Sequence, residues 1–504
     1  MKKIKQITWL SVFMLVLLNT ACNKTEPKYS DWESMKQHQA APDWLADAKF
    51  GVYVHWGLYS VPAFSSEWYP RYMYQQGHPI MQYHQEKFPD MEYHDFAPLF
   101  KAENFDANDW AKLFKASGAR FAGLVAEHHD GFSMWDSDIT PWNSKDIGPM
   151  RDVTGEIATA VRKQGMKLIT TFHHARNVQL YQDKYETECG KKIGQFTNSH
   201  FPYDPDGITS TTDSKLRLLY GNVPKEEWYE DVWFGKLKEV IDNYSPDIIW
   251  FDAWLQPNIP EEYLQKFVAY YFNEADEKQQ DVAVVAKFDL PKHVAMENYE
   301  ILRKSIIDSQ LWMSDESISN DSWCYIEDIK IRPWEEVLRM LIDIVSKNGT
   351  FLLNLSPTAD GTISQDQQNV LLSIGEWLGK YGEAIYDTRN WYIYGQNVMK
   401  ESERGFSSNR DFLNVKYNSN DIRYTTKENV IYATMFGVPK AEQEILLEAF
   451  ASQHTSKFGK IKNIELLGSA NPVEWTLVDG GLILKVTPQM PDMAANVFKI
   501  TTEN

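Results

Sequence analysis

The stretch PDIIWFD, residues 246–252, decides the fold of this chain. Four large apolar residues, Ile248 to Phe251, follow one another without a polar side chain between them. A strand with this pattern is buried on both faces, which is typical of a parallel sheet covered by helices. Amphipathic stretches flank it at 226–244 and 261–276, and they indicate helices. The region therefore predicts an α/β fold built from βα units.

The same alternation of apolar runs and amphipathic stretches extends from residue 45 to residue 388. Six or seven βα units are expected there, and the sequence lacks the G-x-G-x-x-G turn that would favour an open doubly wound sheet. We therefore predict a closed (β/α)8-like TIM barrel over 45–388. The expected strands are 49–56, 120–127, 166–174, 246–252, 282–288 and 350–356, with a weaker one at 309–315. The expected helices are 108–119, 154–165, 226–244, 261–276 and 333–349.

Residues 389–504 have a different pattern of short alternating segments separated by Asn, Gly and Pro. This spacing is typical of antiparallel strands joined by tight turns. Asp479, Gly480 and Gly481 stand between two such segments and predict a hairpin. We therefore expect a C-terminal β-sandwich over 389–504.

The first 21 residues predict an export signal. MKKIK is a positively charged start, and ITWLSVFMLVLL is an apolar run too short to span a bilayer. Ala21 directly precedes Cys22, as in a bacterial lipoprotein cleavage site, although Asn19 and Thr20 leave ordinary secretion open. We expect residues 22–44 to form a polar tether. The protein is thus predicted to be exported, as a periplasmic or outer-membrane lipoprotein of a bacterium.

Composition narrows the classes of partner. With 504 residues and 43% hydrophobic residues, the chain can bury a large core. Its formal net charge of −19 argues against a nucleic-acid partner, because phosphate binding needs a basic surface. Contact with a membrane is expected only through a lipid on Cys22. Cys189 and Cys324 are too few for a disulfide framework and lack metal-ligand spacing. The oligomeric state stays open.

Polar side chains follow most of the predicted barrel strands. In a barrel, residues at the carboxyl ends of the strands face one shared pocket. We therefore expect a convergent set made of His55, Glu127, His128, His129, His173, His174, Asp252 and Lys287.

A metal ion and a sugar are the competing ligands for such a pocket. His128 and His129 are adjacent, so in a strand their side chains point to opposite faces and do not grip one ion. We therefore expect no metal. A sugar suits the composition better, because its hydroxyls bind His and Glu while aromatic rings cover its apolar faces. The chain has 18 Trp, 26 Tyr and 25 Phe. The tryptophans near polar strand ends are Trp56, Trp68, Trp135, Trp142, Trp254 and Trp323.

Asp252 is the strongest candidate for an acid that cleaves glycosidic bonds. It ends the strand that is buried on both faces, and the next helix already begins at Pro260 and Glu261, so Asp252 is not needed as a helix cap. Glycosidic cleavage requires a second carboxyl group, about 5 to 5.5 Å away for retention of configuration or about 6.5 to 9.5 Å away for inversion.

Five motifs in chain order resemble glycoside hydrolase family 29, the α-L-fucosidases. They are KFGVYVHWGLYSVPAFSSEWY (49–69), HHDGFSMWDSDITPWNSKDIGPMRDVTGE (128–156), IIWFDAW (248–254), SDESISNDSWCY (314–325) and DIVSKNGTFLLNLSPTADGTI (343–363). The resemblance implies a barrel that is the catalytic domain, a following β-sandwich, a retaining double displacement, and neither a metal nor an organic cofactor.

The resemblance also implies roles for individual residues. Asp252 matches the nucleophile. The general acid/base is expected at Glu297 in VAMENYE, with Glu316 and Glu67 in reserve. The expected substrate-binding residues are His55, Glu67, Trp68, His128, His129, Trp135, His174, Trp254 and Lys287.

Some residues near the expected pocket depart from the family pattern. Glu127 stands where many members have Lys, Lys287 where Arg is common, and Ala253 where Gly is frequent. His173 and His174 stand where others have Tyr or Ser. These departures leave the linkage and the natural glycan open.

The sequence predicts an exo-acting retaining α-L-fucosidase that releases terminal L-fucose from a fucosylated oligosaccharide or polysaccharide. Two alternatives remain. One is a non-catalytic carbohydrate-binding protein on a glycosidase barrel. The other is a hydrolase of α-galactosides or sulfated fucans, although the negative charge suits a sulfated polymer poorly.

Overall fold

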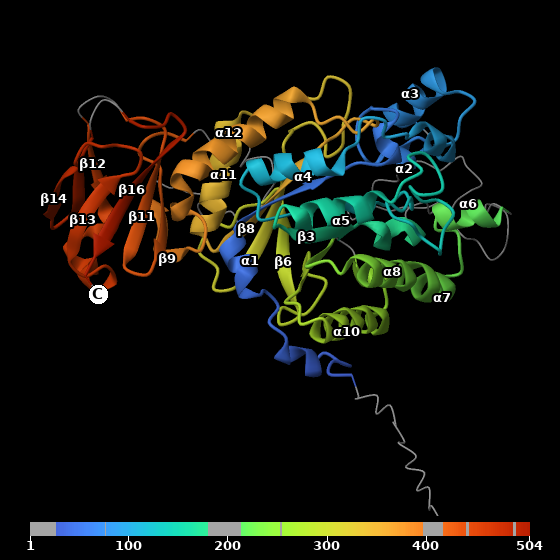
Figure 1. The fold of residues 1–504 in the computed structure, drawn as a ribbon, viewed down its shortest axis with the longest axis horizontal. Helices are drawn as coiled ribbons and strands as arrows, with labels where there is room; N and C mark the ends of the chain where they lie inside the picture. The colour runs from blue at the N-terminus through green and yellow to red at the C-terminus, as the bar shows by residue number, and fades with distance from the viewer. Residues whose placement is uncertain are drawn as a thin grey trace, which may run out of the picture.

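The computed structural model describes residues 27–75, 77–179, 213–252, 255–396, 417–439, 443–486 and 490–503. Its larger part is a closed barrel of eight parallel strands in the order β1 to β8, surrounded by helices (Figure 1). The strands are β1 (Phe50–Val54), β2 (Phe121–Glu127), β3 (Lys167–Phe172), β4 (Ile248–Phe251), β5 (Ala283–Ala286), β6 (Ala295–Glu300), β7 (Trp312–Ser317) and β8 (Gly349–Leu355). The main covering helices are α4 (Ala107–Ala116), α5 (Val153–Lys163), α8 (Gly235–Tyr244), α10 (Glu261–Glu277), α11 (Trp334–Ser346) and α12 (Gln365–Tyr381). The shorter ones are α1 (Asp43–Ala48), α2 (Tyr69–Tyr72), α3 (Pro79–Lys87), α6 (Ser214–Leu219), α7 (Lys225–Glu227) and α9 (Leu255–Asn258).

The barrel closes because β1 pairs with both β2 and β8. Gly51 lies opposite Phe121 of β2, and Tyr53 lies opposite Asn354 of β8. A Cβ atom on Gly51 would come within 2.1 Å of the Phe121 ring, so glycine is the residue that lets this ring fill the interior. The first and last strands of the repeat are thereby joined.

Inward-pointing side chains fill the barrel interior in layers. Tyr53, Ile248, Trp250, Val285 and Met313 belong to this cluster, and all are buried. Two residues of α1, Leu45 and Ala48, pack into the same cluster. The interior is therefore a packed core, and a ligand has access only at its end.

The predicted fold is confirmed. The barrel strands expected from the apolar runs are present, and so is the weaker one near 309–315. Sequence reasoning missed β6 and α12. The residues of β6, Ala295–Glu300, include two glutamates and an asparagine, so they lack the apolar run by which the other strands were found.

The C-terminal part is a sandwich of two antiparallel sheets. One has the order β13-β16-β11-β10-β9 and the other β12-β15-β14. The predicted hairpin is present, because Val478 of β14 pairs with Gly481 of β15. The strands are β9 (Arg389–Gln396), β10 (Ile422–Lys427), β11 (Val430–Phe436), β12 (Glu444–Leu447), β13 (Ile461–Leu466), β14 (Glu474–Val478), β15 (Gly481–Lys485) and β16 (Ala495–Thr502).

The sandwich packs against the barrel through α11 and α12. The Trp377 indole of α12 donates a hydrogen bond to the carbonyl oxygen of Ala495, at 2.9 Å. Asp343 of α11 is fully buried and pairs with Arg423 of β10 and with Lys347, whose Nζ lies 2.8 Å from the carboxylate. Burial alone would raise the pKa of Asp343, but these two cations hold it well below its usual value. The two domains therefore share a buried, charged contact.

The described part of the expected tether, residues 27–44, packs on the barrel instead of extending from it. Tyr29 and Met35 are buried, and the backbone of Tyr29 exchanges hydrogen bonds with the side chain of Asn273 on α10. In Figure 1 this segment lies beside α10. The expected signal, residues 1–21, and Cys22 lie outside the described residues. Among the helices that are described, none is long and apolar enough to cross a membrane.

Candidate active site

A small pocket opens at the carboxyl end of the barrel strands. Its volume is about 140 Å³. The lining combines carboxylates, histidines, cations and aromatic rings. It consists of Tyr53, His55, Glu67, Trp68, His128, His129, His173, Arg176, Trp250, Asp252, Lys287, Glu300, Asp315 and Trp323.

The period of two along each strand explains which side chains reach this pocket. On β4, Ile248 and Trp250 face the interior, so Asp252, two residues further, faces the pocket. On β5, Val285 is interior and Lys287 follows it into the pocket. On β6, Met296 is interior, and Glu300 lies four residues beyond it on the same face.

Asp252 is held by one cation and two imidazoles. Lys287 Nζ contacts its Oδ1, while His129 Nε2 and His173 Nδ1 each lie 3.5 Å from its Oδ2. Burial alone would raise the pKa of Asp252, but the charge of Lys287, helped by His129 and His173, holds that pKa well below its usual value. The carboxylate is therefore ionised, as a nucleophile must be.

Glu300 is the second carboxylate beside Asp252. The Nζ of Lys287 contacts a carboxylate oxygen of both residues. Two carboxylates on one ammonium nitrogen lie close together, at a separation on the order of the 5 Å found between the carboxyl groups of retaining glycosidases. The side chain of Glu300 is 36% exposed and that of Asp252 15%, so Glu300 stands nearer the mouth of the pocket.

Glu67 is a third carboxyl group in the pocket, and it is buried. Burial raises its pKa to about 7, and the nearby charges of Glu300 and Asp252 add to this effect. In the described part of the chain, its Oε2 has no hydrogen-bond partner. Near neutral pH, Glu67 therefore exists partly as a carboxylic acid that can donate a hydrogen bond to a ligand.

Three pocket histidines, His55, His128 and His129, are kept neutral by burial, and hydrogen bonds orient His55 and His129. Burial lowers the pKa of His55 and of His128 well below the ordinary value, and the neighbouring His173 adds to the effect. His55 Nδ1 lies 2.7 Å from Oδ1 of Asn354. His129 Nδ1 lies 2.5 Å from the carbonyl oxygen of His173. Such imidazoles donate and accept hydrogen bonds, as binding of sugar hydroxyls requires.

Aromatic rings form one wall of the pocket. Trp68 lies against His129, with ring centroids 4.7 Å apart. The guanidinium carbon of Arg176 lies over the Trp68 ring, 5.2 Å from its centroid. The ring centroids of Trp323 and His55 lie 5.4 Å apart. These rings offer apolar surface next to the polar groups, which is the combination that a deoxy-sugar needs.

The expected acid/base residue Glu297 and the reserve Glu316 do not reach this pocket. Each lies one residue from an inward-facing neighbour, Met296 and Asp315, so its side chain points to the other face of the sheet. Glu297 pairs with Lys292 at 2.9 Å, and Glu316 lies 3.7 Å from Arg332. The assignment of the acid/base to Glu297 is therefore wrong on geometric grounds.

Two expected sugar-binding residues also lie elsewhere. Trp135 is fully buried, and its indole donates to Glu239 at 3.0 Å. His174 faces away from the pocket, with Nε2 3.3 Å from the carbonyl oxygen of Trp233. Trp254 lies outside the described residues. The pocket does contain the other expected residues, which are His55, Glu67, Trp68, His128, His129, Asp252 and Lys287.

Sequence reasoning did not assign several residues that line the pocket. Glu300 was missed because β6 lacks an apolar run and was not recognised as a strand. His173 was expected at a strand end, but its neighbour His174 was chosen as the ligand. The remaining unassigned residues are Tyr53, Arg176, Trp250, Asp315 and Trp323.

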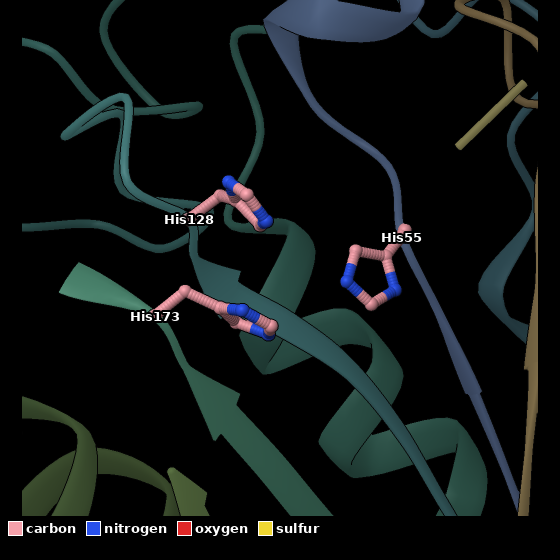
Figure 2. A group of neighbouring side chains, drawn as sticks. All are labelled: His55, His128 and His173. Carbon is pink, nitrogen blue, oxygen red and sulfur yellow. The ribbon is translucent and has the colours of Figure 1, made fainter. Parts of the chain in front are cut away.

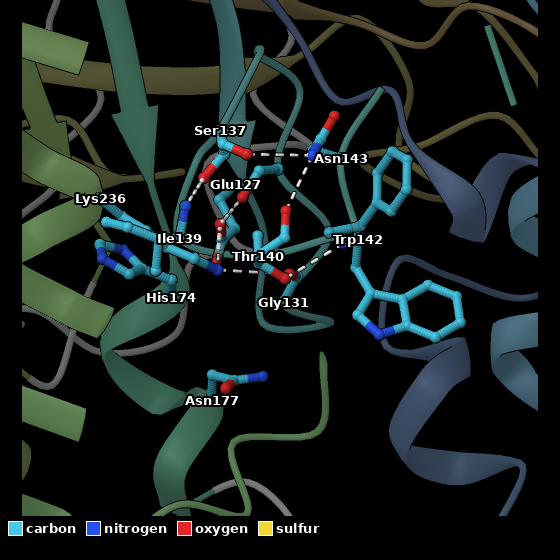
Figure 3. Close-up of polar contacts among 12 residues, drawn as sticks. Glu127, Gly131, Ser137, Ile139, Thr140, Trp142, Asn143, His174, Asn177 and Lys236 are labelled. Atoms are coloured by element: carbon cyan, nitrogen blue, oxygen red, sulfur yellow. Dashed lines mark hydrogen bonds and ion pairs between the residues drawn. The ribbon is translucent and has the colours of Figure 1, made fainter. Parts of the chain in front are cut away.

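A buried ion pair joins Glu127, at the end of β2, to Lys236 of α8 (Figure 3). The carboxylate of Glu127 accepts hydrogen bonds from Lys236 Nζ at 2.8 and 2.9 Å and from Ser133 Oγ at 2.6 Å. Lys236 Nζ also lies 3.5 Å from the carbonyl oxygen of Gly131. This network ties α8 to the loop that carries His128 and His129.

A barrel pocket with an ionised aspartate, a nearby glutamate, neutral histidines and tryptophan rings defines the class of glycoside hydrolases. The profile of the family described as "Alpha-L-fucosidase" matches residues 15–383, and that of the "Alpha-L-fucosidase C-terminal domain" matches residues 416–501. The chain belongs to the α-L-fucosidases, glycoside hydrolase family 29.

Individual relatives agree with this placement. The tissue alpha-L-fucosidases of Rattus norvegicus and Homo sapiens are each 30% identical, over 474 and 479 residues, covering 92% of this chain and 88% of their own. The crystal structure of Thermotoga maritima alpha-fucosidase in complex with fucose superposes with a TM-score of 0.72 at 28% identity, covering 94% of this chain and all of that one.

Proposed function

We propose that this protein is an exo-acting retaining α-L-fucosidase that releases terminal L-fucose from fucosylated oligosaccharides or polysaccharides. One observation carries the proposal: Asp252 and Glu300 contact the same Lys287 ammonium in a pocket of about 140 Å³. The pocket is lined at its base by Trp250 and Tyr53, so it suits one terminal sugar better than the middle of a chain. The fucose bound to the Thermotoga maritima relative supports L-fucose as that sugar.

In the first step, the carboxylate of Asp252 attacks the anomeric carbon while Glu300 gives its proton to the glycosidic oxygen. The aglycone leaves as an alcohol, and fucose remains as an ester on Asp252. Lys287 gives up its contact with Glu300 as the glycosidic oxygen enters, and it stays with Asp252. In the second step, Glu300 takes a proton from a water molecule, which attacks the same carbon and releases fucose with retained configuration.

Glu300 suits the acid/base role better than Glu67 because of exposure. The acid/base must touch the leaving group, which lies at the mouth of the pocket in an exo-acting enzyme. Glu300 is partly exposed there, whereas Glu67 is 5% exposed and belongs among the groups that hold the sugar. The raised pKa of Glu67 keeps it a second candidate for the proton donor.

Azide rescue on an activated aryl α-L-fucoside tests these roles. Asp252→Gly should lose activity and form β-fucosyl azide when azide is added. Glu300→Gly should regain turnover with azide and form the α-azide, because azide then attacks the ester on Asp252. Glu297→Gln, on the opposite face of the same strand, is the matched control and should behave like wild type.

Two results would contradict the assignment. If Glu67→Gly gives the α-azide and Glu300→Gly does not, the acid/base is Glu67. If wild-type protein binds fucose but releases no aryl alcohol, the protein is a carbohydrate-binding protein and not a hydrolase.

We also propose that the protein is exported and anchored by a lipid on Cys22. The support is the sequence of residues 1–22 alone. Expressed in a bacterium, the wild-type protein should incorporate labelled palmitate and fractionate with membranes, whereas Cys22→Ser should do neither. Unlabelled wild-type protein in the soluble periplasmic fraction would contradict the anchor.

A further inference from the structure

Three histidines from three neighbouring strands meet in the pocket. His55 follows β1, His128 follows β2 and His173 follows β3, and their rings face one space (Figure 2). One ligand atom from each lies within 4.8 Å of the others. This triad differs from the adjacent pair His128 and His129, which cannot share an ion within one strand.

The hydrogen bonds of His55 leave one ring nitrogen free to coordinate. Asn354 Nδ2 donates to the carbonyl oxygen of Trp323 at 2.6 Å, so its Oδ1 is the atom that faces His55. His55 Nδ1 therefore carries the proton and donates to this oxygen. Its Nε2 carries the lone pair. A metal-binding histidine is typically oriented in this way, with its other nitrogen donating to a carbonyl or carboxylate.

His173 and His128 also have ring nitrogens available. His173 Nδ1 lies 3.5 Å from Asp252 Oδ2, which places its proton there and its lone pair on Nε2. Within the described residues, His173 Nε2 and His128 Nδ1 are buried and have no hydrogen-bond partner. A buried polar atom without a partner in a native structure calls for an explanation, and a missing ion is one.

The triad must contract to hold an ion. Zinc binds imidazole nitrogens at about 2.0 to 2.1 Å in a tetrahedral arrangement. The rings of His128 and His173 are stacked, with centroids 4.5 Å apart and planes 25° apart, so their lone pairs do not yet converge. Binding of the ion therefore requires the His128 ring to rotate. The χ2 torsion of histidine is broad, and Nδ1 of His128 has no described hydrogen bond to lose.

We propose that His55, His128 and His173 bind one borderline-soft divalent ion of the zinc class, and that this ion and the sugar exclude each other. Three imidazoles suit such an ion and leave its fourth position to water or an external ligand. The exclusion follows because the ion would occupy the same 140 Å³ pocket. This exclusion rests on the proposed function, whereas the binding of the ion does not.

A second group, His129, His173 and Asp252, also brings its ligand atoms within 4.8 Å. It is the poorer site, because Lys287 already contacts Asp252 and its ammonium would repel a divalent cation. The three-histidine group has no cation among its described contacts. The ion is therefore expected at the triad.

Metal binding to the full chain tests the proposal directly. Chelator-treated protein is titrated with Zn²⁺ by calorimetry and with Co²⁺ by visible absorption. Wild type should bind one equivalent, with the Co²⁺ spectrum of a four-coordinate site. His173→Phe should weaken binding at least about 10-fold, since loss of outer partners alone costs about 10- to 100-fold. His454→Phe, which replaces a half-buried histidine of the sandwich domain, is the matched control and should bind like wild type.

Further variants separate the possible outcomes. His128→Phe should also lose the ion, and Asp252→Asn should keep it. The proposal would be overturned if His173→Phe bound the ion as tightly as wild type. It would also be overturned if Asp252→Asn lost the ion while His128→Phe kept it. Thermal unfolding of each chelated variant verifies that it is folded.

Competition with L-fucose tests the exclusion. Fucose should raise the apparent dissociation constant of Zn²⁺, and Zn²⁺ should inhibit hydrolysis competitively. Simultaneous binding of both would overturn the exclusion. Binding of one ion at the triad by a protein without fucosidase activity would refute the proposed function and leave the metal site standing.

Discussion

Removal of Lys236 should destabilise the barrel far more than removal of a neighbouring surface lysine. Lys236 and Glu127 are each 1% exposed, and of the hydrogen bonds that the described residues give the Glu127 carboxylate, only that from Ser133 would remain. Breaking a buried pair from one side typically costs about 3 to 5 kcal/mol, because the remaining charge stays buried without its partner. We expect a loss of this size for Lys236→Met.

Lys238→Met is the matched control on the same helix. Lys238 is 46% exposed and pairs with Asp242 one turn away, and an exposed pair of this kind is worth about 0.3 to 0.5 kcal/mol. In the double variant Glu127→Gln/Lys236→Met neither charge remains, so its cost should be smaller than the sum of the two single substitutions.

Urea denaturation followed by tryptophan fluorescence measures these differences. A chain with two domains need not unfold in one step. The transition of the barrel is identified as the one that shifts when fucose is present. If Lys236→Met costs no more than Lys238→Met, the ion pair does not stabilise the barrel and the reasoning is refuted.

Three further predictions concern the pocket. Glu67→Gln should change how the free energy of unfolding depends on pH. The stability that wild type owes to protonated Glu67 is complete below pH 4.5 and is lost as the pH rises through its pKa of about 7. Over that range, the free energy of unfolding of the variant, measured by urea denaturation, should therefore rise by roughly 3 kcal/mol relative to wild type, and a constant difference would contradict the raised pKa. Trp68→Ala should raise KM for an aryl fucoside whereas Trp135→Phe should not, because of these two residues only Trp68 lines the pocket. An equal rise in KM for both variants would contradict the assignment of Trp68 to the sugar-binding wall. An aryl α-L-galactoside differs from the α-L-fucoside by one hydroxyl on C6, and it should be cleaved with a kcat/KM about 10- to 200-fold lower, since one hydroxyl in an apolar setting costs about 1 to 3 kcal/mol; equal rates would contradict a pocket built for the methyl group.

The fold could be predicted because most barrel strands carry an unbroken apolar run. Ile248 to Phe251 is such a run, and counting by two from its interior residues leads to Asp252. The strand β6 has no such run, because Glu297, Asn298 and Glu300 lie within it. Its register could not be assigned from hydrophobicity, and the choice between two glutamates on opposite faces was therefore not constrained.

Contacts between distant segments account for the rest of the site. Lys236 comes from α8 and meets Glu127 across 109 positions of sequence, which no local pattern indicates. His173 and His174 are adjacent, and only the register of β3 decides that the first faces the pocket. Trp135 lies close in sequence to His129, yet it packs into the core beside Phe172. Proximity in sequence to a strand end is therefore weaker evidence than position within the strand.

The configuration of the sugar at the moment of release tests the central claim most directly. Proton NMR of the first turnovers on an aryl α-L-fucoside distinguishes the two anomers before they interconvert. If Asp252 and Glu300 act as nucleophile and acid/base on one sugar, α-L-fucose is formed first and the β anomer follows only by mutarotation. β-L-Fucose as the first product would mean that water attacks directly, and it would contradict the account.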